Sequence, residues 1–168
     1  MIFCKNLPIT PFYKGFKSSK SLCDVLIIHL FTAIASDVLL LLTAMTSALY
    51  LRQDYFLKHR KKIISLPSIQ SIDNLGLKLL ISAFIFMTVG ILAGSVLAYE
   101  QWGSHWYLDP RQIWSMVNWA VFAVVLMARF WVGWRGRTAV LITLSGVTLM
   151  LLGFWALHYF DWSQHEGL

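Results

Sequence analysis

Long apolar runs alternate with short polar connectors along this chain, and this pattern dominates its sequence. Four apolar segments reach the roughly 20 residues that a helix needs to cross the hydrocarbon core of a bilayer. They are about Val25–Leu51, Leu75–Ala98, Ile113–Val132 and Thr138–Phe160. Inside a bilayer only helices and closed barrels satisfy their own backbone polar groups. The pattern therefore predicts an all-α membrane protein, with a four-helix transmembrane unit over residues 25–160, an N-terminal tail over 1–24 and a C-terminal tail over 161–168.

Composition agrees with a membrane protein, and the distribution of charge predicts its orientation in the membrane. Hydrophobic residues make up 58% of the chain and charged residues 13%, against about 25% charged in a soluble domain. Basic residues gather in and beside the connectors after the first and third spans, as is typical of cytoplasmic connectors. They are Arg52, Lys58, Arg60, Lys61, Lys62, Arg129, Arg135 and Arg137. We therefore expect a multi-pass protein of the cytoplasmic (inner) membrane, with its middle connector and C-terminal tail external, or periplasmic.

The N-terminal tail opposes this orientation. Lys5, Lys14, Lys17 and Lys20 precede a span that should begin outside. The basic residues of the two connectors outnumber these four lysines, so we follow the connectors. The net charge of +6 does not indicate a nucleic-acid partner, because the basic residues lie mostly in connectors and act as topology signals.

The middle connector, Trp102–Trp114, is rich in flat aromatic rings with donors and charge between them. Its tryptophans are Trp102, Trp106 and Trp114, and His105, Asp109 and Arg111 lie among them. Aromatic rings are common at the membrane interface, but this density suits a large flat amphiphile, and haem is the obvious candidate. Arg111 would contact a haem propionate or a lipid headgroup. Asp109, followed by Pro110, suits the N-cap of the third helix.

Four histidines meet at the external face under this topology. They are His29, near the start of the first span, His105 in the middle connector, and His158 and His165 near the end of the chain. Imidazole is the usual proximal ligand of haem iron. Two such ligands from opposite ends of the bundle would clamp a haem against the Trp-rich connector, although a single interfacial histidine is more often an ordinary polar residue.

The middle connector follows a pattern close to W-G-x-x-W-x-W-D-P-x-x-x-W. The matching residues are Trp102, Gly103, Trp106, Asp109, Pro110 and Trp114, and Leu108 stands at the third tryptophan position. The connector resembles the WWD motif of the cytochrome c assembly proteins, in their CcsA/ResC branch. The resemblance extends from about His29 to the C-terminus. Members of that branch have further helices upstream, so this chain resembles a short or N-terminally truncated member.

The resemblance implies a haem site at the external face. Family members have two external histidines that flank the WWD segment, and His29 and His165 fall at or beside those positions, as axial ligands of the iron. The further haem contacts that it implies are Trp102, Trp106, Asp109, Trp114, Arg111 and His105. The haem would be b-type, held without covalent bonds while in transit.

Two further residues, besides Leu108, depart from the family pattern, and a glycine pair predicts packing. Met127 stands where members have a histidine near the cytoplasmic side; a thioether can ligate haem, but methionine in an apolar helix is usually packing. Asp37 is an intramembrane acid, which is costly and by default functional, and a structural role stays equally open. Gly90 and Gly94 have the small-x-x-x-small spacing that permits close helix contact.

The resemblance implies that the protein binds haem and presents it at the outer face for covalent attachment to apocytochrome c. It would be the haem-handling component of a cytochrome c synthetase complex, beside a CcsB/ResB-like membrane partner. No catalytic residue is indicated, and we expect no independent enzymatic activity. Two alternatives stay open: a membrane b-type haem electron-transfer subunit, which needs histidine pairs inside the membrane, and a HemX-like scaffold or regulatory membrane protein.

Overall fold

Four long α-helices make up the protein. The structure is a computed structural model, and it describes residues 19–59, 67–102 and 110–165. The helices are α1 (Ser19–Lys58), α2 (Ile69–Trp102), α3 (Pro110–Trp131) and α4 (Arg137–His165). All four are long and apolar enough to cross a membrane, and no strand occurs over these residues. The prediction of an all-α, multi-pass membrane protein with four transmembrane helices is confirmed.

The helices extend beyond the apolar segments that predicted them, except at the C-terminal end of α3, which ends at Trp131. α1 begins at Ser19 and ends at Lys58, where an ion pair of 2.9 Å between Lys58 and Asp54 supports the last turns. α2 begins at Ile69 because Ser68 caps it, accepting a hydrogen bond from the backbone N–H of Ser71 at 3.3 Å. A hydropathy pattern identifies only the apolar part of a helix that suits lipid. It therefore does not predict the polar first and last turns.

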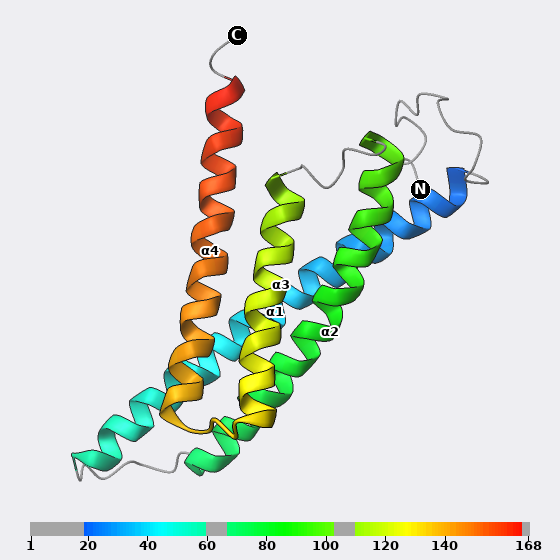
Figure 1. Cartoon of the computed structure of the whole chain (residues 1–168). Helices are drawn as coiled ribbons and strands as arrows, with labels where there is room; N and C mark the ends of the chain where they lie inside the picture. The colour runs from blue at the N-terminus through cyan, green and yellow to red at the C-terminus, as the bar shows by residue number, and fades with distance from the viewer. Residues whose placement is uncertain (1–18, 60–66, 103–109, 166–168) are drawn as a thin grey trace.

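The helices alternate in direction, so the starts of α1 and α3 lie at the same end of the bundle as the ends of α2 and α4 (Figure 1). α1 packs most extensively on α2, and the further contacts of α1 with α4, α3 with α4 and α2 with α3 close the ring. A core of buried side chains holds the middle of the bundle together. It comprises Leu40, Leu80, Ala83, Phe122, Val125, Leu126 and Val147.

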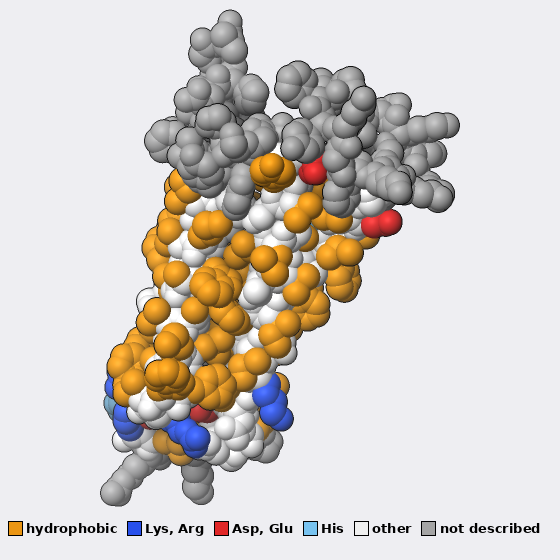
Figure 2. All heavy atoms as spheres, turned by 45° about the vertical axis from the view of Figure 1, so that its right-hand side comes forward, with side chains coloured by type: hydrophobic (Ala, Val, Ile, Leu, Met, Phe, Trp, Pro, Cys, Tyr) orange, Lys and Arg blue, Asp and Glu red, His pale blue; other side chains and the backbone are white. Residues whose placement is uncertain are grey.

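Charge separates to the two ends of the bundle, with exposed apolar side chains between them (Figure 2). We call the end with Lys58, Arg135 and Arg137 the basic end, and the end with Asp24 and Glu100 the acidic end. The apolar surface between them suits contact with lipid. Its most exposed members include Phe31, Leu92, Leu152, Phe154 and Trp155. Both connectors that the charge pattern assigns to the cytoplasm therefore lie at one end.

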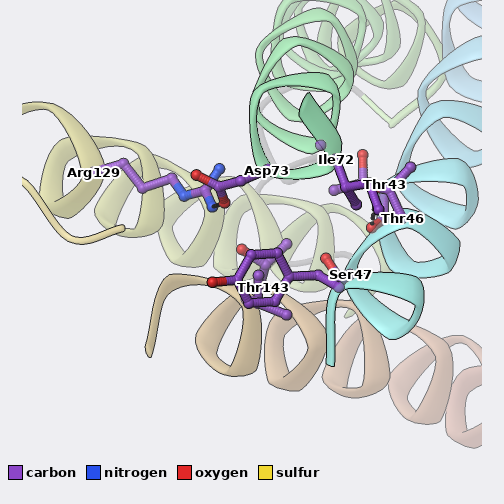
Figure 3. A pocket seen from close by; sticks show the side chains of 10 residues that line it. Thr43, Thr46, Ser47, Ile72, Asp73, Arg129 and Thr143 are labelled. Carbon is purple, nitrogen blue, oxygen red and sulfur yellow. Dashed lines mark hydrogen bonds and ion pairs between the residues drawn. The ribbon is translucent and has the colours of Figure 1, made fainter. Parts of the chain in front are cut away.

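A buried ion pair joins α2 to α3 at the basic end. Arg129 Nη2 lies 2.6 Å from Asp73 Oδ1, and the two side chains are only 6% and 8% exposed. Figure 3 shows the pair beside a small cavity lined by hydroxyl groups of α1 and α4, including Thr43 and Thr143. The cavity holds about 10 Å³, close to the minimum for one water. Arg129, which the sequence counts among the connector cations, is thus a buried interhelical residue.

The connector between α3 and α4 turns on two glycines. Gly133 and Gly136 have φ values of 71° and 72°, a left-handed conformation that glycine adopts at little cost. The backbone N–H of Trp134 donates to the Ala128 carbonyl at 3.3 Å and closes the last turn of α3. A β carbon at Gly136 would lie 3.0 Å from the Tyr50 hydroxyl, whereas one at Gly133 would meet nothing within 4 Å.

We expect Gly136→Ala to lower the thermal stability of the purified protein more than Gly133→Ala does. Both changes force alanine into the left-handed region, at about 1–2 kcal/mol, but only the first also presses on Tyr50. Thermal unfolding in detergent measures the difference. Adding Tyr50→Phe to Gly136→Ala removes the crowded oxygen and should recover part of the loss. Equal losses for the two glycine variants would contradict this contact.

Candidate functional site

A largely apolar pocket that contains several polar groups lies among all four helices, between the core and the acidic end. We call it the His29 pocket. Its defining residues are His29 and Asp37 of α1, Gly90 and Gly94 of α2, Trp114 and Asn118 of α3, and Met150 and Phe154 of α4. Its volume is about 260 Å³, a little below the 300–1,000 Å³ of typical ligand pockets. It is open on one side, so a large flat ligand would be held by part of its surface.

His29 lies in a notch that the two glycines of α2 leave open. Its Nδ1 is 2.8 Å from the Gly90 carbonyl oxygen, and because a carbonyl only accepts, Nδ1 carries the proton. A β carbon at Gly94 would lie 2.8 Å from Cε1 of the imidazole. The close contact that the glycine spacing predicts is confirmed, and its occupant is the histidine ring. In the neutral ring this hydrogen bond leaves the Nε2 lone pair available, the state that binds iron.

Trp114 and Asn118 form the α3 wall of the pocket. The indole of Trp114 packs directly on Gly153 of α4, where any β carbon would overlap the ring. Asn118 donates from Nδ2 to the Trp114 carbonyl at 2.9 Å and is only 5% exposed. Among the described residues, Trp114 Nε1 and Asn118 Oδ1 are buried without a hydrogen-bond partner. This wall therefore offers an unsatisfied donor and an unsatisfied acceptor.

Other polar groups of the pocket differ in their partners. Gln112 donates from Nε2 to Ser95 Oγ at 3.0 Å, which ties α3 to α2 near the acidic end. Ser36 donates to the Ala83 carbonyl at 3.2 Å. Asp37 and His29 are the only ionisable side chains that line the pocket within the described ranges. The pocket thus contains one imidazole, two side-chain amides and one carboxyl group among the described residues.

The sequence predicts eight site residues. Of these, the structure places His29 and Trp114 together in one pocket. Trp102 ends α2, Arg111 lies in the first turn of α3, and His165 ends α4, all at the acidic end (Figure 1); their side chains lie outside the described part. The remaining three, His105, Trp106 and Asp109, lie outside the described residues altogether. Pairing of His29 with His165 as axial ligands therefore stays a prediction.

Sequence reasoning missed Asn118, Gln112 and Ser115 as pocket residues. Their signal was a spacing of three along an otherwise apolar span, which places polar groups near one helix face. Asp37, left open between a functional and a structural role, lines the pocket. Met127 is 51% exposed on the outside of the bundle and lines neither this pocket nor the cavity beside Arg129.

Comparison with known proteins identifies relatives of the chain. The family model described as "Cytochrome C assembly protein" matches residues 1–161. The cytochrome c biogenesis protein CcsA of Synechocystis sp. is 38% identical over 100 residues, covering 55% of this chain and 30% of the relative. The CcsA of Gloeobacter violaceus is 40% identical over 103 residues, with the same coverage of 55% and 30%.

A third CcsA, from Welwitschia mirabilis, is 32% identical over 127 residues, covering 70% of this chain and 42% of the relative. The chain therefore spans less than half the length of these curated relatives. No solved structure matches it.

Proposed function

Because the chain belongs to the cytochrome c assembly protein family, we propose that it serves cytochrome c maturation by holding haem in the His29 pocket. The observation that carries this proposal is the state of His29. A backbone carbonyl fixes its proton on Nδ1, and the ring lines a pocket shared by all four helices. An imidazole fixed through one nitrogen is the usual arrangement for a ligand that binds iron through the other.

Haem is the substrate in this proposal, a b-type haem in transit. His29 supplies one axial ligand and His165, at the end of α4, the other. Trp102 at the end of α2, Trp106 in the middle connector and Trp114 near the start of α3 provide flat surfaces against the ring. Arg111 and His105 contact the haem periphery, and Asp109 supports the start of α3.

The acidic end of the bundle faces outward in this proposal, and the basic end faces the cytoplasm, because basic residues favour the cytoplasmic side. Apocytochrome c then meets the haem from outside the inner membrane. Each cysteine thiol adds across a haem vinyl group, so that sulfur bonds to one vinyl carbon and hydrogen to the other. The protein contributes positioning and axial ligation, beside a CcsB/ResB-like membrane partner.

The test is the haem content of a His29→Ala variant purified from cells that make haem. We expect its haem content to fall about tenfold, because the variant loses one axial ligand, and we expect added imidazole to restore part of it. His59→Ala is the matched control: its Nδ1 also lies near a backbone carbonyl, that of Tyr55 at 2.9 Å, but at the basic end. Unchanged haem in His29→Ala would overturn the site, and wild-type protein without haem would favour a scaffold role.

A further inference from the structure

Two buried polar atoms of the His29 pocket require a partner that the described residues do not supply. They are Nε1 of Trp114, a donor, and Oδ1 of Asn118, an acceptor. Leaving a buried hydrogen-bonding group unpaired costs about 1–3 kcal/mol, and the bilayer around this segment offers no water from outside. The two atoms belong to residues one turn apart, joined by the bond from Asn118 Nδ2 to the Trp114 carbonyl.

A single group that both accepts and donates would satisfy this pair. A protonated carboxylic acid does so, since its carbonyl accepts from the indole N–H and its O–H donates to the amide oxygen. The neutral form also suits the location. The pocket lies among the four helices within the membrane-spanning part of the bundle, where burial disfavours an ionised carboxylate.

Haem carries such groups on one edge and its vinyl groups on the opposite edge. Resting on the proposed function, we propose that Asn118 and Trp114 hold a haem propionic acid group in its neutral form. The vinyl edge then lies at the acidic end, where the thiols of apocytochrome c arrive. This orientation replaces the contact between Arg111 and a propionate, one of the two contacts that the sequence left open, because both propionates share the inward edge.

The depth of the two residues agrees with this orientation. Gln112 bonds to Ser95, which follows directly on Gly94 at the His29 notch, so Gln112 marks the level of His29. Asn118 lies six residues further along α3, or about 9 Å toward the core at 1.5 Å per residue. A ring bound at iron through His29 would thus extend one edge down to Asn118.

The experiment compares haem with its dimethyl ester, whose propionates cannot donate a hydrogen bond. Each porphyrin is titrated into purified protein in detergent, and its absorption spectrum gives the dissociation constant. We expect wild-type protein to bind haem about tenfold more tightly than the ester, as one or two hydrogen bonds would give. In Asn118→Leu, a change of similar size that removes the acceptor, that ratio should fall to about one or two.

Gln53→Leu is the matched control, because it removes a buried amide of α1 near the basic end, away from the His29 pocket, whose Oε1 also has no partner among the described residues. Its preference for haem over the ester should equal that of the wild type. The proposal is overturned if the wild type binds both porphyrins equally, which would leave the orphan atoms to an ordered water, or if Asn118→Leu keeps the full preference. Failure of the proposed function would give a different result from failure of this inference. In that case neither porphyrin would bind in a manner that depends on His29.

Discussion

Asp73→Ala is expected to lower the free energy of unfolding by about 3–5 kcal/mol, because it leaves the guanidinium of Arg129 buried without its counter-charge. Arg129 and Asp73 are 6% and 8% exposed and lie 2.6 Å apart. Arg129 Nε is already buried without a partner among the described residues, so the carboxylate is its main compensation. Denaturant unfolding in mild detergent, followed by circular dichroism, measures the loss.

The exposed ion pair of α1 provides the control. Lys58 Nζ and Asp54 Oδ2 lie 2.9 Å apart, with side chains 57% and 21% exposed. Asp54→Ala should therefore cost no more than about 0.5 kcal/mol. Replacing Asp73 and Arg129 together by leucine should recover most of the loss, since burying a charge pair is itself costly. A small effect of Asp73→Ala alone would show that water reaches Arg129.

Hydropathy predicted the four spans because burial in lipid acts on every residue of a span. It could not predict the fate of single polar residues near the ends of helices. Arg129 follows an apolar run and looks like a cytoplasmic anchor, yet its partner, Asp73, belongs to the first turns of α2. The two residues are 56 positions apart, and only the packing of α2 against α3 brings them together.

In the candidate site, too, the sequence predicted some residues and could not predict others. Tryptophan and histidine stand out in a membrane sequence, so Trp114 and His29 were predicted from residue type and topology. Asn118 is a single amide in an apolar span, and its importance depends on the missing partner of Oδ1, which is a property of the folded helices. The spacing of the α2 glycines predicted close helix packing. It did not predict that an imidazole occupies the notch between the helices.

Filling that notch with a large side chain should remove haem more completely than removing the histidine does. A β carbon at Gly94 would lie 2.8 Å from Cε1 and 3.0 Å from Nδ1 of His29. The first distance is too short for a contact, so the ring has to shift from the position in which it bonds to the Gly90 carbonyl. We expect Gly94→Ala to lower haem content several-fold and Gly94→Leu to lower it more than tenfold. Added imidazole should not restore haem to Gly94→Leu, because the leucine side chain occupies the space that imidazole needs.

Gly76→Ala is the matched control for Gly94→Ala. Gly76 forms a similar contact between α1 and α2 nearer the basic end, where a β carbon would lie 3.2 Å from Thr46 Oγ1. That hydroxyl ends a short side chain and can yield, so haem content should stay at the wild-type level while thermal stability falls slightly. If Gly76→Ala and Gly94→Ala lose haem equally, general loosening of the α1–α2 contact is the cause, and the notch has no special role in holding His29 toward iron.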